Sequence, residues 1–131
     1  APNWAGVIQA LVEAGAAVEA RDRRGFTPMM TAGEKGSRET VAALANIGAE
    51  VDAKEVRGGK RTPLVIAAQK ANASAAAALL EYGARVNATN ESAGMTPLHL
   101  AVANDQHTAA RLLVHSGANV CLPDARGLTC L

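Results

Sequence analysis

The stretch GMTPLHLA, residues 94–101, decides the fold because the phrase inside it recurs along the chain at a nearly constant interval. Thr-Pro begins at positions 27, 62 and 96, and Thr-Cys begins a fourth copy at 129, so the spacings are 35, 34 and 33 residues. A second phrase, Gly-Ala-x-Val, begins at positions 15, 48, 83 and 117, spaced 33, 35 and 34 residues. Two phrases with one shared period predict a solenoid of stacked units.

Each unit carries the signals of a helix pair. Thr27 is suited to cap the free amides at the start of a helix, and Pro28 fits the first helical position. In the second helix of a unit, Ala110, Leu113 and Val114 follow the i, i+3, i+4 spacing of an apolar stripe, and Gly117 ends the helix. The position four residues before that glycine is always leucine, which predicts a buried row made of Leu11, Leu44, Leu79 and Leu113.

These motifs resemble the ankyrin repeat family, whose pattern Asp-x-x-Gly-x-Thr-Pro-Leu-His-x-Ala-Ala is matched by residues 22–32 and 94–101. The resemblance covers nearly the whole chain and implies an all-α ankyrin solenoid with β-hairpin-like finger loops and a concave groove that binds partner proteins. We expect one array over residues 1–131, divided into a partial repeat (1–20), three repeats (21–53, 54–88 and 89–121) and the start of a further repeat (122–131). Because the sequence opens inside a unit, we expect it to be part of a longer array.

Composition narrows the class of protein. The net charge of +1 argues against bulk nucleic-acid binding, and the 2% aromatic content requires a core of Ala, Leu and Val. No apolar run reaches the length of about 20 residues that a membrane span needs, and the start lacks the charged region of a signal peptide. We therefore expect a soluble intracellular protein, cytoplasmic or nuclear, in which Cys121 and Cys130 are free thiols.

The candidates for chemistry are weak. His99 belongs to the repeating phrase, where the resemblance implies a hydrogen-bonded brace of the neighbouring loop. The spacings of His107, His115, Cys121 and Cys130 match no zinc pattern, and residues 58–60, Gly-Gly-Lys, lack the rest of a phosphate loop. We expect no enzyme activity, no metal and no cofactor.

Departures from the pattern locate the variable surface. The finger from Val51 to Thr62 spans eleven residues and the finger from Val86 to Thr96 spans ten, whereas the first and last span nine. Lys60 takes the place of the usual finger glycine, so we expect a different turn there. Between the two helices of a unit the glycine at position 36 becomes Ala71 and Asp105, and alanine is poorly suited to a left-handed turn.

The resemblance also implies where a partner would bind. The family positions that contact partners lie in the fingers and at the ends of the first helices, and here they are Arg23, Arg24, Phe26, Arg61, Met95, Glu34, Lys35, Gln69, Lys70 and Asn104, with Tyr82 as a further candidate. Together with Arg21, Lys54, Arg57 and Lys60, the first two fingers carry a run of positive charge that favours an acidic peptide or protein surface. We expect exposed Phe26 and Met95 to provide apolar anchors.

The leading hypothesis is a non-catalytic protein-interaction module, and several alternatives stay open. The segment could be a structural spacer of a larger ankyrin scaffold or channel. The longer third finger and the phrase at 99–104 are similar to the middle repeats of inhibitors of Rel/NF-κB transcription factors. A nucleic-acid contact through the basic fingers and oxygenase modification of Asn87 are the remaining alternatives.

Overall fold

The computed structural model describes residue 10, residues 18–56 and residues 58–129. Its described part contains six helices and no strand, so the expected all-α class is confirmed. The helices form three pairs: α2 (Pro28–Lys35) with α3 (Arg38–Asn46), α4 (Pro63–Gln69) with α5 (Ala73–Glu81), and α6 (Pro97–Ala103) with α7 (His107–His115). Leu11, Arg57 and Cys130, which the sequence analysis singles out, lie outside the described residues.

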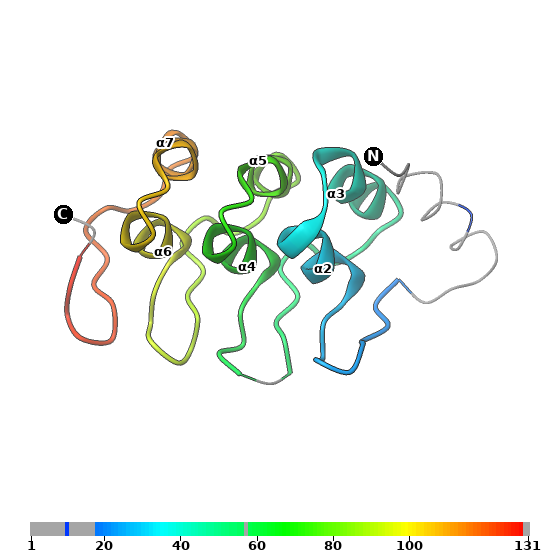
Figure 1. Ribbon diagram of the computed structural model, residues 1–131, viewed down its shortest axis with the longest axis horizontal. Coiled ribbons are helices and arrows are strands. Elements are labelled where there is room, and N and C mark those ends of the chain that lie inside the picture. The colour runs from blue at the N-terminus through cyan, green and yellow to red at the C-terminus, as the bar shows by residue number, and fades with distance from the viewer. Residues whose placement is uncertain (1–9, 11–17, 57, 130–131) are drawn as a thin grey trace.

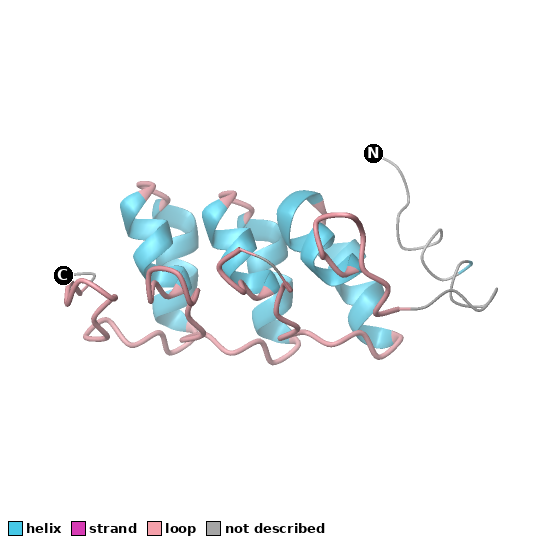
Figure 2. Cartoon of the chain, turned by 90° about the horizontal axis from the view of Figure 1, so that it is seen from below, coloured by secondary structure: helices cyan, strands magenta, loops and turns pink. Residues whose placement is uncertain are grey.

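The pairs are arranged as two parallel rows of helices with finger loops along one side. Figure 1 shows α2, α4 and α6 in the row beside the fingers, and α3, α5 and α7 in the row away from them. Figure 2 shows the three pairs from below, with the loops running along the array. Each helix packs against its counterpart in the next pair, so the expected solenoid of stacked units is confirmed.

The start of each first helix follows from the Thr-Pro dipeptide. The hydroxyl oxygens of Thr27, Thr62 and Thr96 accept hydrogen bonds from backbone N–H groups three residues later, at 3.4, 3.3 and 3.2 Å. The proline that follows each threonine occupies the first helical turn, where a missing N–H costs nothing. The helix starts predicted from the repeating phrase are therefore confirmed.

The predicted leucine row forms the centre of the core. The exposed fractions of Leu44, Leu79 and Leu113 are 3%, 0% and 0%, and burying each side chain is worth about 2 kcal/mol. Ala75 and Ala78 are fully buried within α5, which lets the neighbouring helices approach closely. Small side chains and leucine thus fill most of a core that has few aromatic side chains.

The turn between the helices of a pair differs between units. Ala71 and Asp105 adopt the left-handed conformation, with φ of 59° and 57°. Gly36, by contrast, is extended, with φ of −80° and ψ of 171°, because α2 continues one residue further than α4 and α6. Ala71 therefore carries backbone strain, because the β-carbon of alanine disfavours a positive φ. Gly36 adopts an extended conformation that any residue can adopt.

The turn of the second finger differs from the turns of its neighbours. Lys60 has a φ of 51°, close to the values of 79° and 62° for Gly25 and Gly94 at the same place in the neighbouring fingers. The turn of this finger nevertheless differs from the others, as predicted. Gly58 is also left-handed, with φ of 68°, and the backbone bond from Glu55 N–H to the Arg61 carbonyl oxygen spans six residues, whereas the bond from Asp22 N–H to the Phe26 carbonyl oxygen spans four. A non-glycine residue pays a conformational penalty of about 1 kcal/mol at the position of Lys60.

One side-chain acceptor closes each finger, and its position accounts for the variable finger length. An oxygen of Asp22, Glu55, Asn90 or Asp124 accepts a hydrogen bond from the backbone N–H of the residue just before the threonine position, at 3.0–3.1 Å in the first three fingers and 2.9 Å in the last. The two residues are four, six, five and four positions apart, respectively. The longest finger uses glutamate, whose side chain has one more methylene than aspartate or asparagine.

Candidate protein-interaction surface

The fingers and the C-terminal turns of the first helices meet at one surface, which we call the finger–helix surface. Arg24 of the first finger reaches Glu34 in the last turn of α2, and Arg61 of the second finger reaches Gln69, the last residue of α4. The structure thus brings together the candidate residues that the resemblance placed in two separate segments of each unit.

The side chain of Phe26 forms the floor of this surface. Its exposed fraction is 4%, and it packs with Met30, Ala53 and Ile66 in a small core cluster. The guanidinium carbons of Arg24 and Arg61 lie 4.1 and 5.7 Å from the ring centre. The expectation of an exposed Phe26 anchor is therefore wrong, because the two arginines cover the ring.

Both arginines are held by carboxylates. Arg24 Nη1 donates to the two oxygens of Glu34 at 3.1 Å, and its Nη2 lies 3.6 Å from Asp22 Oδ2. Arg61 donates from Nε and Nη2 to the two oxygens of Glu55, at 2.6 and 3.1 Å. These bonds fix the two planar groups over the ring and offset their charges locally.

The Glu55 carboxylate is an inward charge of the second finger, with an exposed fraction of 4%. Burial alone would raise its pKa, but the hydrogen bonds from the Arg61 side chain and backbone outweigh burial, so its pKa lies below the ordinary value. Glu55 therefore stays ionised and acts as a structural tie between the two ends of the finger.

The tips of the second and third fingers are joined by charge. Lys54 Nζ and Lys60 Nζ lie 3.5 and 3.3 Å from the two oxygens of Glu91. The hydrogen bond from Lys60 and the attraction of both ammonium groups lower the pKa of the Glu91 carboxyl. Two lysines and one glutamate leave one positive charge uncompensated at this place.

The run of positive charge expected in the fingers is thus largely paired within the molecule. Arg21 donates to the backbone carbonyl oxygens of Gly25 and Lys54, at 2.8 and 3.0 Å. Among the described residues, three exposed candidate cations have neither a hydrogen bond nor an ion pair from their side chains, and these are Arg23, Lys35 and Lys70. The sequence overstates the free charge of the fingers because it does not show which neighbouring carboxylates pair with them.

The excess of basic residues is nevertheless uneven along the chain. Residues 21–70 contain ten Lys and Arg residues and six Asp and Glu residues, although the whole chain carries a net charge of only +1. All four lysines of the sequence fall in this segment, in the fingers or at the ends of the first helices. The part of the array from the first finger to the end of α4 therefore carries the positive charge.

The remaining candidate residues lie in three different settings. Met95 is half-buried against Val65, Ala68 and Leu100, so it offers less apolar surface than expected. Asn104 is exposed at the C-terminus of α6. Tyr82, with an exposed fraction of 39%, ends α5 in the row of helices away from the fingers (Figure 1). The structure therefore does not bring Tyr82 to the finger–helix surface.

His99 has the structural role that the resemblance implies. Its Nδ1 accepts a hydrogen bond from the backbone N–H of Thr96 at 3.1 Å, which completes a capping box. Its Nε2 then donates to the carbonyl oxygen of Leu128 in the last finger, at 3.0 Å. Both ring nitrogens are occupied, so His99 is a brace between two fingers.

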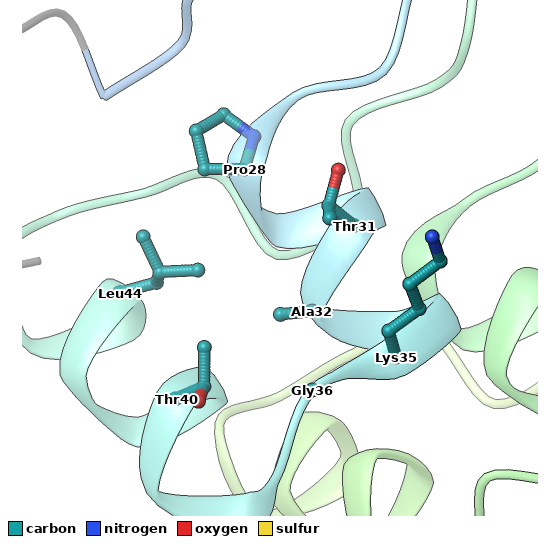
Figure 3. A pocket seen from close by; sticks show the side chains of 7 residues that line it. All are labelled: Pro28, Thr31, Ala32, Lys35, Gly36, Thr40 and Leu44. Carbon is teal, nitrogen blue, oxygen red and sulfur yellow. The ribbon is translucent and has the colours of Figure 1, made fainter. Parts of the chain in front are cut away.

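A pocket of about 320 Å³ lies between α2 and α3, and Figure 3 shows the side chains that line it. Its lining includes Pro28, Ala32 and Leu44, with Lys35 beside them, and it contains no carboxylate, histidine or cysteine among the described residues. In the described ranges, no three His, Cys, Asp or Glu side chains gather as metal ligands. This hollow is a mainly apolar surface between two helices.

Sequence reasoning missed the contacts between units. Asn72 caps α5 by accepting from Ala75 N at 3.2 Å, and its Nδ2 donates to the carbonyl oxygens of Gly33 and Gly36 in the preceding unit, at 3.2 and 2.9 Å. A second set of bonds joins successive units through Asp52 and Asn87, whose side-chain oxygens accept from the backbone N–H groups of Arg85 and Asn119. An asparagine just before a helix indicates a cap, but its second pair of bonds is visible only in the stacked structure.

Comparison with known proteins gives one family. A family model described as ankyrin repeats, in three copies, matches residues 54–124. No curated protein matches the sequence at a significant level. Within the described residues, no helix has both the length and the apolar character needed to cross a membrane.

Proposed function

Because the chain belongs to the ankyrin repeat family, whose members are generally protein–protein interaction modules, we propose that it binds a partner protein through the finger–helix surface. The observation that carries this proposal is the set of unpaired cations at this surface, Arg23, Lys35 and Lys70. A free ammonium or guanidinium group attracts a partner carboxylate without first breaking an internal ion pair. The partner is therefore an acidic peptide or an acidic protein surface.

The paired arginines have a different part in the proposed function. Arg24 and Arg61 cover the Phe26 ring and hold Glu34 and Glu55, so they shape the surface on which the partner lies. A surface that is rigid before binding loses less conformational entropy when the partner docks. We accordingly assign these two residues to the support of the site and the unpaired cations to the attraction of the partner.

No catalytic step belongs to the proposed function. The buried carboxylate of Glu55 is used in an ion pair with Arg61, and both ring nitrogens of His99 are used in the brace between fingers. We also propose an intracellular location, in the cytoplasm or the nucleus. Cys121 is a free thiol, and these reducing compartments keep thiols free.

The test is affinity capture from a cell extract with three forms of the chain. The surface variant carries Arg23→Gln, Lys35→Gln and Lys70→Gln. The control carries three arginine-to-glutamine changes outside the finger–helix surface, at Arg38, Arg85 and Arg111, and therefore has the same net charge. The proposal predicts an acidic protein retained by the parent and the control but lost by the surface variant, whereas equal retention by all three forms would contradict it.

A spacer role within a larger array is the second candidate, and the bonds between units favour it. Asn72, Asp52 and Asn87 each join one unit to the next through side-chain hydrogen bonds. Such bonds transmit tension or rigidity along an array without any partner at the surface. Capture lists that are empty for all three folded forms would favour the spacer.

A further inference from the structure

The tips of the second and third fingers carry a cluster of Lys54, Lys60 and Glu91 that has no role in the proposed function. Lys54 and Lys60 approach the carboxylate of Glu91 from two sides, one ammonium group at each oxygen. All three side chains are about half exposed, and both ion pairs exceed 3.2 Å, so the contact is open to competition from another anion. The carboxylate carries one negative charge, whereas the two lysines carry two positive charges.

The backbone shows that this lysine placement has a conformational cost. Lys60 is left-handed, at the position where the other three fingers have glycine. A lysine at that position costs stability that a glycine would not, and strain of this kind is kept where the side chain has a use. The use visible in the structure is to bring a second ammonium group to the anion that Lys54 contacts.

Close packing holds the tips of the second and third fingers together beside the two lysines. A methyl group built on Gly59 would lie 2.9 Å from Ser92 Oγ, so the glycine allows the third finger to approach. The backbone N–H of Glu91 donates to the Gly59 carbonyl oxygen at 2.7 Å and fixes the two tips together.

We propose that Lys54 and Lys60 bind the phosphoryl group of a phosphoserine or phosphothreonine in the partner protein, in place of the Glu91 carboxylate. A phosphoryl monoester carries a charge of about −1.5 to −2 and three acceptor oxygens, so it balances both lysines and accepts from both ammonium groups. Glu91 swings to solvent when the ligand is bound. This inference rests on the proposed function, since it adds a phosphorylated residue to the acidic partner.

The probe is a short capped peptide, Gly-Ala-phosphoserine-Ala-Gly, with counterparts that carry serine or glutamate at the centre. Binding is followed through the backbone amide signals of residues 58–60 and 92 in two-dimensional NMR spectra at low salt and neutral pH. We expect saturable shifts of these signals with the phosphopeptide, none with the serine peptide, and binding of the glutamate peptide that is weaker by at least about threefold. Equal affinity for the glutamate and phosphoserine peptides would overturn the proposal.

Two variants move the affinity in opposite directions. Lys60→Gly suits the left-handed backbone, leaves the finger folded and removes one ammonium group, so we expect the phosphopeptide to bind about two- to fivefold more weakly. Glu91→Gln removes the internal competitor, and we expect tighter binding by a similar factor. Arg111→Gln removes an exposed cation of α7, outside the finger–helix surface, and leaves the affinity unchanged.

Unchanged affinity in Lys60→Gly, or weaker binding in Glu91→Gln, would refute the assignment of the phosphoryl site to these lysines. The result is independent of the capture experiment, which changes Arg23, Lys35 and Lys70 and leaves the finger tips intact. Failure of the titration with successful capture would remove the phosphoryl site alone. Failure of both would remove the protein-interaction function itself.

Discussion

Asn72→Ala tests the contact that joins the first two pairs of helices. The change removes the cap of α5, which is worth about 1 kcal/mol, and two part-buried hydrogen bonds to the carbonyl oxygens of Gly33 and Gly36, worth about 0.5–1.5 kcal/mol each. We therefore expect the free energy of unfolding to fall by about 2–4 kcal/mol. In a urea titration this corresponds to a midpoint lower by about 1–2 M.

The equivalent residues of the other pairs are the natural controls. Ser37 caps α3 through its hydroxyl and makes no side-chain bond to another unit within residues 18–56 and 58–129, so Ser37→Ala should cost about 1 kcal/mol. Gln106 makes no cap bond at the start of α7, so Gln106→Ala should change stability by less than about 0.5 kcal/mol. A graded series of Asn72, Ser37 and Gln106 is the expected order of loss.

Asn72→Asp separates the two parts of the effect. Aspartate keeps an acceptor for the α5 cap but has no donor for the carbonyl oxygens of Gly33 and Gly36. We expect this variant to lose at least half of the stability lost by Asn72→Ala. If Asn72→Ala cost no more than Ser37→Ala, the bonds between units would contribute nothing, and the reasoning would be refuted.

Three further predictions concern stability. Leu79→Ala should lower the free energy of unfolding, measured in urea, by about 2–4 kcal/mol because the side chain is fully buried. Val114→Ala, at a half-exposed position, should cost less than about 1 kcal/mol. Similar losses in the two variants would contradict the leucine row. Ala71→Gly should raise the melting temperature, since glycine relieves a left-handed φ of 59° worth about 1 kcal/mol, and a lower melting temperature would count against that strain. The pKa of Glu55 is depressed in the folded chain, so its stabilising contribution is present above its ordinary pKa of 4.5 and disappears as the pH falls through the lower folded value. Acid titration of Glu55→Gln should therefore show a shallower loss of stability below about pH 4.5 than the parent shows, and identical slopes would exclude this ion pair as a cause of acid unfolding.

The repeating positions of the fold could be predicted because each is a local signal with a fixed period. Thr27 and its counterparts cap helices through bonds only three residues long, and the leucine row follows from its constant distance to a glycine. The finger lengths were also visible in the sequence. The predictions of the helix starts, the leucine row and the finger lengths do not depend on which side chains meet across units.

The chemistry of the surface could not be predicted in the same way. Phe26 reads as an exposed finger residue, but its ring is covered by Arg61, which is 35 positions away in the sequence. The charges of Lys54 and Lys60 are offset by Glu91 of the next finger. These pairings depend on the distance between adjacent fingers and on the direction of each side chain, which a linear pattern does not contain.

The central claim is that unpaired cations at the finger–helix surface hold an acidic partner, and its most direct test is lysine modification of the captured complex. Acetylation rates of Lys35 and Lys70 would be measured by mass spectrometry with the partner bound and with the chain alone. The capture experiment already controls for cations outside the surface through the variant at Arg38, Arg85 and Arg111. The account predicts that both lysines react more slowly in the complex. Unchanged rates at Lys35 and Lys70 with the partner bound would contradict it.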